Sequence, residues 1–522
     1  MVKEIGKRPA QITIEISEEE ILKRISQIED LDIEDDLREF LIQALRALVR
    51  LDQVVGMKDT TIARLRKIFG KKIEKKDKPR PERPKKHPRG NNNGRTGKKD
   101  YPGAPTVQHE CTDLNKGDRC PECYLGNLYE WEPGIYIRIT GSAPLSAVIH
   151  ETQKLRCGAC GKIFEAEFEG KNAPKYDEKA KAIIALLKYK ASVPFYRLAK
   201  IQKQLYTPMP PSTQWDLMEQ LANILISVWK ALISIAPEGN LFHQDDTKGK
   251  VLELFKENQY RTKSDKKARK GIYTSGILSE LSDGKKVILY FTGRKYSGEN
   301  LTGILRERKS TSVPIVMSDA LPSNKIKERE VLETFCNAHG RRKFFDLGKK
   351  FEEESKYILD RLEIVYKTDK EAKTKNMCPK KRLELHQEKS KTAIDELEEW
   401  FGKAFEKKIV EPNSQLGKSV KYMNKHWHGL TEFMRTPGVP LDNNVLERKL
   451  RLPVLNRKNW YFYKTEVGAL VGDIIVSVVE TAAEAGVNIF DYLVWLQKNK
   501  EDVKQNSEKY LPWNFKPEDM IN

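Results

Sequence analysis

Three acidic side chains stand at positions where carboxylates could bind metal ions. Asp245 follows the strand-like run LFHQ, and Asp319 ends a second apolar run, VPIVMSD. Glu447 lies about one turn into LDNNVLERKLRLPVLNRKNW, which predicts a short helix that Asp442 caps and Pro453 ends. Strand ends and helix starts can converge at one edge of a mixed sheet, where three carboxylates would hold two divalent cations, Mg²⁺ or Mn²⁺. Two such ions about 3.5–4 Å apart clamp the attacking and leaving oxygens of a phosphoryl transfer.

Each of these acids also has a simpler interpretation. An Asp-Asp pair at a strand end is often only a turn, and Asp246 competes with Asp245 for the first position. Asp319 could cap a helix, and Glu447 could form an ion pair with Arg451 on a solvated helix face. Because successive strand residues point to opposite faces, only one member of the Asp-Asp pair can face the other two acids. We expect this residue to be Asp245.

Basic residues accompany the second and third acids along the chain. Since a phosphodiester is anionic, these side chains are candidates to hold DNA phosphates. Taken singly, each is equally compatible with a solvated surface. The candidates are His339, Arg341, Arg342, Arg448, Arg451 and Lys458.

Four of the seven cysteines form two CxxC pairs, CPEC and CGAC, separated by 33 residues. This spacing is typical of a zinc ribbon, in which two tight turns present four thiolates tetrahedrally. A site filled by four sulfur ligands has no open position for chemistry, so the ion is structural. Unpaired buried cysteines are the alternative. We expect one structural Zn²⁺ bound by Cys120, Cys123, Cys157 and Cys160.

The composition favours an anionic partner. The 522 residues include 94 Lys and Arg against 75 Asp and Glu, which gives a net charge of +19. Such an excess is typical of nucleic-acid-binding proteins, although a generally basic soluble protein can share it. No run approaches the roughly 18 apolar residues of a membrane span, and the N-terminus does not resemble a signal peptide. We therefore expect a cytoplasmic protein with no membrane partner.

Composition and periodicity divide the chain into eight segments. In chain order they are an N-terminal helical region, 1–70; a basic flexible linker, 71–100; the zinc ribbon, 101–175; a helical segment, 176–236; the first part of a catalytic core, 237–345; a helical insertion, 346–434; the glutamate helix, 435–465; and a C-terminal helical region, 466–522.

Three of these segments keep alternatives open. The apolar spacing from Leu37 to Val55 suits a short coiled coil or a plain amphipathic helix, and the basic run TTIARLRKIF could complete a helix-turn-helix. The linker carries 13 Lys and Arg against 4 Asp and Glu, so it either contacts the DNA backbone or only aids solubility. The segment 176–236 is either a DNA-binding helix-turn-helix, with Ser212 or Thr213 capping its second helix, or a scaffold for the next domain.

Apolar runs in the core segment predict a sheet. LFHQDDTKGKVLEL, GIYTSGILSEL and KKVILYFTG are strand-like, and their close succession indicates antiparallel pairing. VPIVMSDAL predicts a buried strand, and LETFCNAHGRRKFFDLG predicts a short strand that runs into a basic helix. With the charged helical segments around it, the chain is expected to be an α+β multidomain protein.

The chain resembles the insertion-sequence-66 family of bacterial transposases, a group of DDE enzymes, over about residues 60–500. The resemblance rests on RLRKIFG, GRTGKKDYPGA, GDRCPEC with LRCGACGKIF, HQDDT, SDA, CNAHGRRKFF and LDNNVLERKLRLPVLNRKNW. It implies a ribonuclease-H-like core with a catalytic triad at Asp245, Asp319 and Glu447, and a helical insertion before the glutamate. The sequence departs from the family where Asp246 replaces a glutamate, and where Ala320 and Leu321 replace Gly and Tyr after the second aspartate.

The resemblance also implies an activity and its partners. Two Mg²⁺ ions would support cleavage of a strand at the element end, which frees a 3′ hydroxyl, and attack of that hydroxyl on target DNA. The partners would be double-stranded DNA, as terminal repeats and as target, and further copies of the chain in a dimer or larger assembly. Whether accessory transposition proteins also take part stays open. The protein would be associated with the nucleoid in a bacterial or archaeal cytoplasm.

Two other functions fit part of the sequence. A nuclease or resolvase of the same fold would hydrolyse DNA without strand transfer, and the several DNA-binding segments argue against it. An inactive, repurposed DNA-binding protein would be expected to have lost one of the acids, whereas all three are present.

Overall fold

The computed structural model describes residues 116–119, 121, 127–128, 144–156, 163–169, 171–260, 269–348 and 350–520, together with 27–28, 37–38 and 41. The chain divides into two compact units, Met1–Arg138 and Ile139–Asn522, and the elements below belong to the second. Most of the heptad-like repeat, the whole basic linker and the four cysteines predicted to bind zinc lie outside the described residues.

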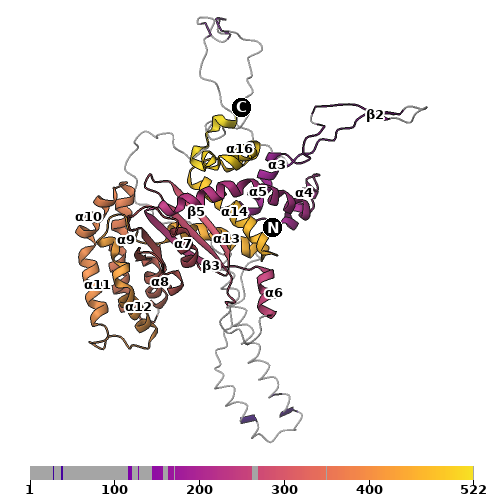
Figure 1. Ribbon diagram of the computed structural model, residues 1–522. Coiled ribbons are helices and arrows are strands. Elements are labelled where there is room, and N and C mark those ends of the chain that lie inside the picture. Colours follow the sequence, from indigo (N-terminus) through magenta and orange to yellow (C-terminus); the bar gives the residue numbers. More distant parts are fainter. Residues whose placement is uncertain are drawn as a thin grey trace. The chain divides into compact units, whose positions relative to one another are not determined.

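A five-stranded mixed sheet lies at the centre of the second unit, in the order β5-β4-β3-β6-β7 (Figure 1). The first three strands in sequence pair antiparallel, whereas β6 runs parallel to β3 and β7 runs parallel to β6. The bounds are β3 Leu241–Lys248, β4 Tyr273–Glu280, β5 Lys286–Gly293, β6 Ile315–Ser318 and β7 Leu332–Phe335. The α+β class and the antiparallel pairing of the first three strands are therefore confirmed.

The run LFHQDDTKGKVLEL is not a single strand. β3 ends at Lys248, and helix α6 begins at Leu252 and continues to Tyr260. A Cβ atom at Gly249 would lie 3.0 Å from the backbone of Tyr273, so the chain passes too close to β4 there for a larger residue. The glycine thus marks the turn that the prediction missed.

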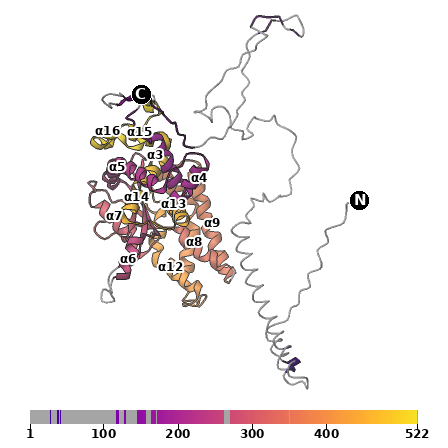
Figure 2. The same cartoon turned by 90° about the vertical axis from the view of Figure 1, so that its right-hand side faces the viewer.

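Helices cover both faces of the sheet (Figures 1 and 2). α7, Ser297–Leu305, and α13, Asn444–Trp460, both pack against β3 and β4. They lie on opposite faces, because the side chain of His243 contacts α13 at Asn443 whereas that of Asp246 contacts α7 at Ser297. One strand of the sheet therefore presents alternate residues to two different helices.

Helix α14, Glu466–Glu484, lies along the outer edge of the sheet at β5. Thr481 Oγ1, Ser477 Oγ and Asp473 Oδ2 accept hydrogen bonds from three alternate backbone N–H groups of β5, at 3.0, 2.9 and 2.6 Å. An uncovered edge strand would leave these donors free to pair with another chain. Side chains at four-residue spacing on one helix face thus close this edge of the sheet.

A second hydrophobic cluster joins the helices that follow β7. It is centred on Phe344, Leu362, Leu397 and Phe401, and α12 also packs against β7. The helices are α8 Asn337–Leu347, α9 Glu352–Thr374, α10 Pro379–Lys389, α11 Lys391–Lys403 and α12 Gln415–Leu430. The segment for which a helical insertion was predicted is thus largely helical.

Helices on the N-terminal side of β3 pack with those at the C-terminal end. They are α3 Glu178–Ala185, a π-helical turn Leu186–Lys190, α4 Phe195–Gln204, α5 Pro211–Ile235, α15 Ile489–Lys498 and α16 Lys500–Gln505. α5 begins directly at Pro211, so neither Ser212 nor Thr213 is its cap, because proline at the first helical position needs no partner for its nitrogen.

Helix α5 packs against α14 with nine of its side chains buried, among them Leu221, Leu225 and Val228. Among the described residues it is also the one helix, as Pro211–Glu238, with the length and hydropathy of a membrane span. Its apolar side chains are accounted for by the core. This burial favours the scaffold role for α5 over a role as a DNA-recognition helix.

Candidate active site

Asp245 and Asp319 lie near each other at neighbouring strands. β3 and β6 are parallel and pair as far as His243 with Met317, so Asp245, two residues further along β3, lies near Asp319, which directly follows the end of β6 at Ser318. The backbone turns immediately after β6, where Ala320 has a φ of 65°. This left-handed conformation favours glycine, so the alanine occupies the position at a cost of about 1–2 kcal/mol.

Glu447 reaches the face of the sheet that carries Asp245 from the first turn of α13. Leu446 and Leu450 of this helix are buried against β4 at Gly276, which pairs with Asp245. A Cβ atom at Gly276 would lie 2.9 Å from Leu450 Cδ2 and 3.3 Å from Leu446 Cδ1. The absence of a side chain at this position therefore lets the glutamate helix lie close to the strand that carries Asp245.

Asn443 fastens the start of α13 to β3. It is fully buried, its Oδ1 lies 2.8 Å from His243 Nδ1, and its Nδ2 donates to the carbonyl of Gln244 at 3.1 Å. The bonded residues directly precede Asp245. The amide of Asn443 thus fixes the glutamate helix relative to the first aspartate, a role that the sequence analysis did not assign.

The charges of the three acids act on one another. Burial, and then the charge of Asp319 with a smaller effect of Glu447, raises the pKa of Asp245 to about 7. The backbone N–H of Asp246 opposes this rise by donating to Asp245 Oδ1 at 2.7 Å. A cation bound among these carboxylates would relieve their repulsion. The hard oxygen donors and this electrostatic tension both fit Mg²⁺.

Asp246 has a different role on the opposite face. Both of its carboxylate oxygens accept hydrogen bonds from the backbone N–H of Ser297 at 3.0 Å, and its oxygens also accept from the hydroxyls of Ser275 and Ser297. It therefore holds the first turn of α7 against the sheet. The two neighbouring aspartates are separated by the pleat of β3, as the sequence analysis expected.

A tighter cluster forms around Glu447. Its Oε1 lies 3.5 Å from His339 Nδ1 and 3.7 Å from Cys336 Sγ, and the three ligand atoms lie within 4.8 Å of one another. Within the described residues this is the sole group of three or more such ligands, so the three acids do not form one compact coordination sphere. Burial raises the pKa of the Cys336 thiol to about 12, against the effect of N–H groups from Asn443 and His339. The sequence analysis missed Cys336, although its CxxH spacing to His339 was a readable signal.

Three of the predicted phosphate ligands share one side of α13. Arg448, Arg451 and Lys458 are exposed and follow Glu447 at helical spacing. Their neighbour Lys449 has a different role, because it forms ion pairs with Glu480 and Glu484 of α14 at 3.4 and 3.0 Å.

Two more predicted phosphate ligands line a surface hollow of about 500 Å³ between α8, α9 and α13. The guanidinium of Arg341 lies 5.9 Å from the ring centre of Phe345 and 6.0 Å from that of Tyr366. Arg342, Asn444 and Glu363 also line the hollow, which therefore combines two cationic groups with aromatic, amide and carboxylate groups. His339, in contrast, faces Glu447.

Pro453 does not end the glutamate helix, which continues through it to Trp460. A proline cannot donate to the carbonyl four residues earlier, here that of Lys449. The hydroxyl of Tyr290 donates to that carbonyl at 3.1 Å instead. A tertiary contact from β5 thus replaces the missing helical hydrogen bond and overrides the local signal.

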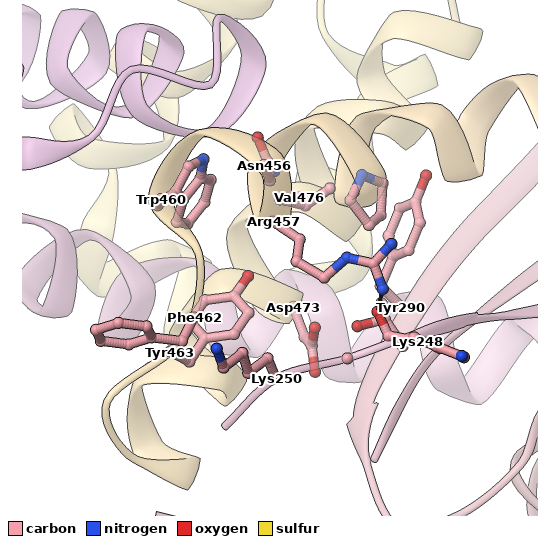
Figure 3. A pocket seen from close by; sticks show the side chains of 13 residues that line it. Lys248, Lys250, Tyr290, Asn456, Arg457, Trp460, Phe462, Tyr463, Asp473 and Val476 are labelled. Atoms are coloured by element: carbon pink, nitrogen blue, oxygen red, sulfur yellow. Dashed lines mark hydrogen bonds between the residues drawn. The ribbon is translucent and has the colours of Figure 1, made fainter. Parts of the chain in front are cut away.

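A small cavity beside this second half of α13 is lined by Tyr290, Asn456, Arg457, Trp460 and Asp473 (Figure 3). Its volume of ≈ 30 Å³ has room for a water molecule or two, which excludes a nucleotide. The Arg457 guanidinium donates to the carbonyl of Lys248 across it. The cavity therefore belongs to the packing that fixes α13.

The predicted zinc ligands lie outside the described residues, but the segments beside them pair. Arg119 and Asn127 form an antiparallel bridge on either side of the CPEC pair. β1, Lys154–Arg156, pairs antiparallel with β2, Ile163–Glu165, on either side of the CGAC pair. Each CxxC pair thus falls in the connection of a short antiparallel pairing.

Comparison with known proteins identifies the family. The family model described as "Transposase IS66 family" matches residues 175–470, more than half of the chain, so the chain belongs to the IS66 family of transposases. Curated relatives include uncharacterized proteins y4hP and y4jD of Sinorhizobium fredii (strain NBRC 101917 / NGR234), 31% identical over 201 residues and 28% identical over 193 residues. The aligned regions cover 35% and 36% of these relatives and equal shares of this chain. No solved structure matches the chain.

Proposed function

We propose that this protein is a DDE transposase, which cleaves DNA at the ends of its insertion sequence and joins them to target DNA. The observation that carries this proposal is the register of β3 and β6. It puts the end of β6, which Asp319 directly follows, beside the part of β3 that contains Asp245, and α13 contacts β3 with Glu447 in its first turn. The raised pKa of Asp245, which reflects burial and the charges of both other acids, supports the same grouping.

The sheet topology supports a ribonuclease-H-like core. Three antiparallel strands followed by two parallel ones, in the order β5-β4-β3-β6-β7, put β3 at the centre of the sheet, between antiparallel β4 and parallel β6. Asp245 belongs to this central strand, and Asp319 follows its parallel neighbour. The proposed core thus has its first acid within the central strand β3 and its second directly after the neighbouring strand β6, and it takes the third from a helix that follows the α9–α12 segment.

Each acid has a proposed role toward two Mg²⁺ ions. Asp245 would contact both ions, while Asp319 and Glu447 would contact one each. Bound Mg²⁺ would supply the positive charge that stabilises a phosphoryl group during in-line displacement. Asn324 holds the Asp319 carboxylate in place, because its Nδ2 donates to Oδ1 at 2.8 Å. Asn443 does the same for the helix of Glu447.

DNA would contact two groups of basic side chains, one on α13 and the other in the hollow between α8, α9 and α13. Arg448, Arg451 and Lys458 on α13 would neutralise backbone phosphates. The hollow with Arg341, Arg342, Phe345 and Tyr366 could take a phosphate and stack an unpaired base. The +19 net charge supports double-stranded DNA as the partner.

Two further features of the whole protein are proposed. Cys120, Cys123, Cys157 and Cys160 would hold one structural Zn²⁺, which the antiparallel pairings beside both CxxC pairs support. Synapsis of two element ends requires a dimer or larger assembly. Zinc analysis of the purified chain, and light scattering on paired-end DNA, test these two proposals.

A strand-transfer assay tests the central proposal. Purified protein is mixed with labelled element-end DNA, plasmid target and Mg²⁺, and we expect 3′-hydroxyl ends followed by joined products. Cleaved ends without joined products, even when pre-cleaved ends with a free 3′ hydroxyl are supplied, would identify a hydrolytic nuclease. Binding without either product would identify a repurposed DNA-binding protein.

A further inference from the structure

Of the clustered residues Cys336, His339 and Glu447, only Glu447 has a role in the proposed Mg²⁺ chemistry. Cys336 is the single residue between β7 and α8, and His339 lies in the first turn of α8. Glu447 meets them from the first turn of α13. Oε1 of Glu447 is 3.7 Å from the sulfur and 3.5 Å from His339 Nδ1. Two helix starts thus bring a sulfur, a nitrogen and an oxygen donor to one point.

The surroundings of the three donors decide how a cation would bind. His339 Nδ1 is buried and among the described residues has no hydrogen-bond partner, and Glu447 Oε1 lies 3.5 Å from it. The backbone N–H of Asn443 donates to Cys336 Sγ at 3.2 Å, but burial raises the pKa of this thiol to about 12, so a bound cation has to displace the thiol proton. Cys336 is fully buried, whereas His339 and Glu447 are partly exposed. An ion can therefore enter past the two outer ligands and reach the sulfur behind them.

This donor set selects a particular class of cation. Thiolate and imidazole ligands suit Zn²⁺ and similar borderline ions, whereas Mg²⁺ takes oxygen ligands almost exclusively. Three protein ligands leave a fourth tetrahedral position for water. The same carboxylate would then be a ligand of two chemically different sites.

We infer that Cys336, His339 and Glu447 form a site for a thiophilic divalent cation of the Zn²⁺ type, and that its occupancy withdraws Glu447 from the acidic triad. The second half of this inference rests on the proposed function, in which Glu447 holds Mg²⁺. Zn²⁺ would then inhibit an enzyme that Mg²⁺ activates. The site is separate from the cysteine pairs proposed to hold structural zinc.

Cobalt binding tests the site without any activity. Co²⁺ is added to the full-length protein purified with zinc, and thiolate-to-cobalt absorption is recorded for the wild type and for C336S, H339Q and E447Q. We expect the wild type to show absorption that is absent from C336S, and affinities more than about tenfold weaker in H339Q and E447Q. C378S, which removes the exposed cysteine, is the matched control and should bind as the wild type does. Cobalt that exchanges into the CxxC pairs contributes equally to the absorption of the wild type and of C336S, so it does not affect the difference between them.

The outcomes separate the two halves of the inference. No difference in cobalt absorption between wild type and C336S overturns the site, and H339Q with unchanged affinity does so even where C336S does not fold.

A second experiment tests the competition between Zn²⁺ and Mg²⁺. For the wild type and for H339Q, the rate of Mg²⁺-dependent cleavage of element-end DNA with added Zn²⁺ is divided by the rate without it. We expect the concentration of Zn²⁺ for half inhibition to rise more than about tenfold in H339Q. Equal inhibition of both proteins overturns the competition, whereas a wild type that binds cobalt but never cleaves contradicts the proposed function alone.

Discussion

The two neighbouring aspartates of β3 face different helices, and the proposed function gives only the first of them a catalytic role. Asp245 faces α13 and the other two acids, and its pKa is raised to about 7 by burial and by their charges. Asp246 faces α7 and uses its oxygens to hold Ser297 and Ser275. The same side chain in consecutive positions therefore has two roles, because the strand pleat sends each to a different helix.

Substitution of these acids should separate activity from stability. Asp245→Asn, Asp319→Asn and Glu447→Gln should each lower cleavage by at least about a thousandfold, as removal of one member of a catalytic set does. DNA binding should persist, because each change removes a negative charge and keeps the shape. Gel-based cleavage and binding assays measure both effects.

Asp246→Asn is the matched control. It should keep cleavage within about tenfold of the wild type, but lower the free energy of unfolding by about 1–2 kcal/mol through weaker capping of α7. Loss of activity in Asp246→Asn with normal activity in Asp245→Asn would show that the assignment is wrong by one residue.

At the residue scale, the sequence was informative where side-chain type and strand position coincide. The two aspartates and the helical glutamate could be located because the strand signals next to them are strong, although Asp245 lies within β3 and not at its end. The role of Asn443 could not be predicted, since it depends on a contact with a residue 200 positions away, whereas the CxxH spacing of Cys336 was a signal but its contact with Glu447, 111 positions away, was not predictable. Strand alternation predicted that Asp245 and Asp246 lie on opposite faces, but not which of them faces α13.

The elements that carry the site are fixed by long-range contacts at both ends of α13. Asn443 bonds to β3 at the start of the helix, and Asn456 Oδ1 accepts from Ser192 Oγ at 2.6 Å near its end. Between them, Tyr290 supplies the hydrogen bond that Pro453 cannot make. The sequence predicted that this helix ends at Pro453, because no local pattern indicates that Tyr290 of β5 donates a hydrogen bond to the carbonyl of Lys449.

The two buried asparagines of α13 offer a matched test of positioning. Asn443→Ala should cost about 2–4 kcal/mol of stability, because His243 and the carbonyl of Gln244 lose their partner. It should also lower kcat more than tenfold in protein shown to be folded, since small displacements of a catalytic group are costly. Asn456→Ala should be destabilising too, but leave kcat within about threefold. Equal effects of both changes on kcat would remove the special role of Asn443.

We expect the stability of the protein to depend on pH, because α14 contains the buried carboxyl group of Asp473. Burial raises the pKa of Asp473 to about 7, although Thr292 donates to both of its oxygens. The unfolded carboxyl ionises near its ordinary pKa, so between about pH 4 and 7 the folded state binds more protons. The free energy of unfolding should therefore fall as pH rises through this window, with a limit of about 4 kcal/mol.

Two variants isolate this effect. Asp473→Asn should lose the share of the pH dependence that Asp473 contributes and keep the share of Asp245, whose pKa is also raised to about 7, and it should be more stable than the wild type at pH 8 but not at pH 4. Ser477→Ala removes a neutral partner of the same edge strand and should cost about 1–3 kcal/mol at every pH. Denaturant titrations at pH 4 to 8 measure these differences, and a wild-type curve that is flat in pH would contradict the raised pKa.

At the scale of the whole molecule, the positive charge is unevenly distributed. Residues 71–100 carry 13 Lys and Arg against 4 Asp and Glu, close to half of the +19 net charge. In the helices α9–α11, by contrast, many lysines are neutralised by nearby acids, as in Lys373–Asp369 and Lys403–Glu399. Close to half of the net positive charge of the chain therefore comes from residues 71–100, whereas many of the lysines in α9–α11 are paired with acids.

This distribution predicts where the salt dependence of DNA binding arises. Each phosphate neutralised contributes about −0.9 to the slope of log affinity against log salt. Replacing six linker lysines by Gln should therefore flatten the slope by up to about five for any DNA sequence. The six are Lys71, Lys72, Lys75, Lys76, Lys85 and Lys86. Fluorescence anisotropy at several salt concentrations measures it.

A control with the same change in net charge decides whether position or total charge matters. Six lysines that form ion pairs with acids in α9–α11 are changed to Gln: Lys367, Lys373, Lys375, Lys389, Lys391 and Lys403. We expect their slope to stay within about one of the wild type, because a lysine already paired with a carboxylate releases few counterions from DNA. If both sets flatten the slope equally, the linker has no privileged contact with DNA, and the net charge of the whole chain sets the affinity.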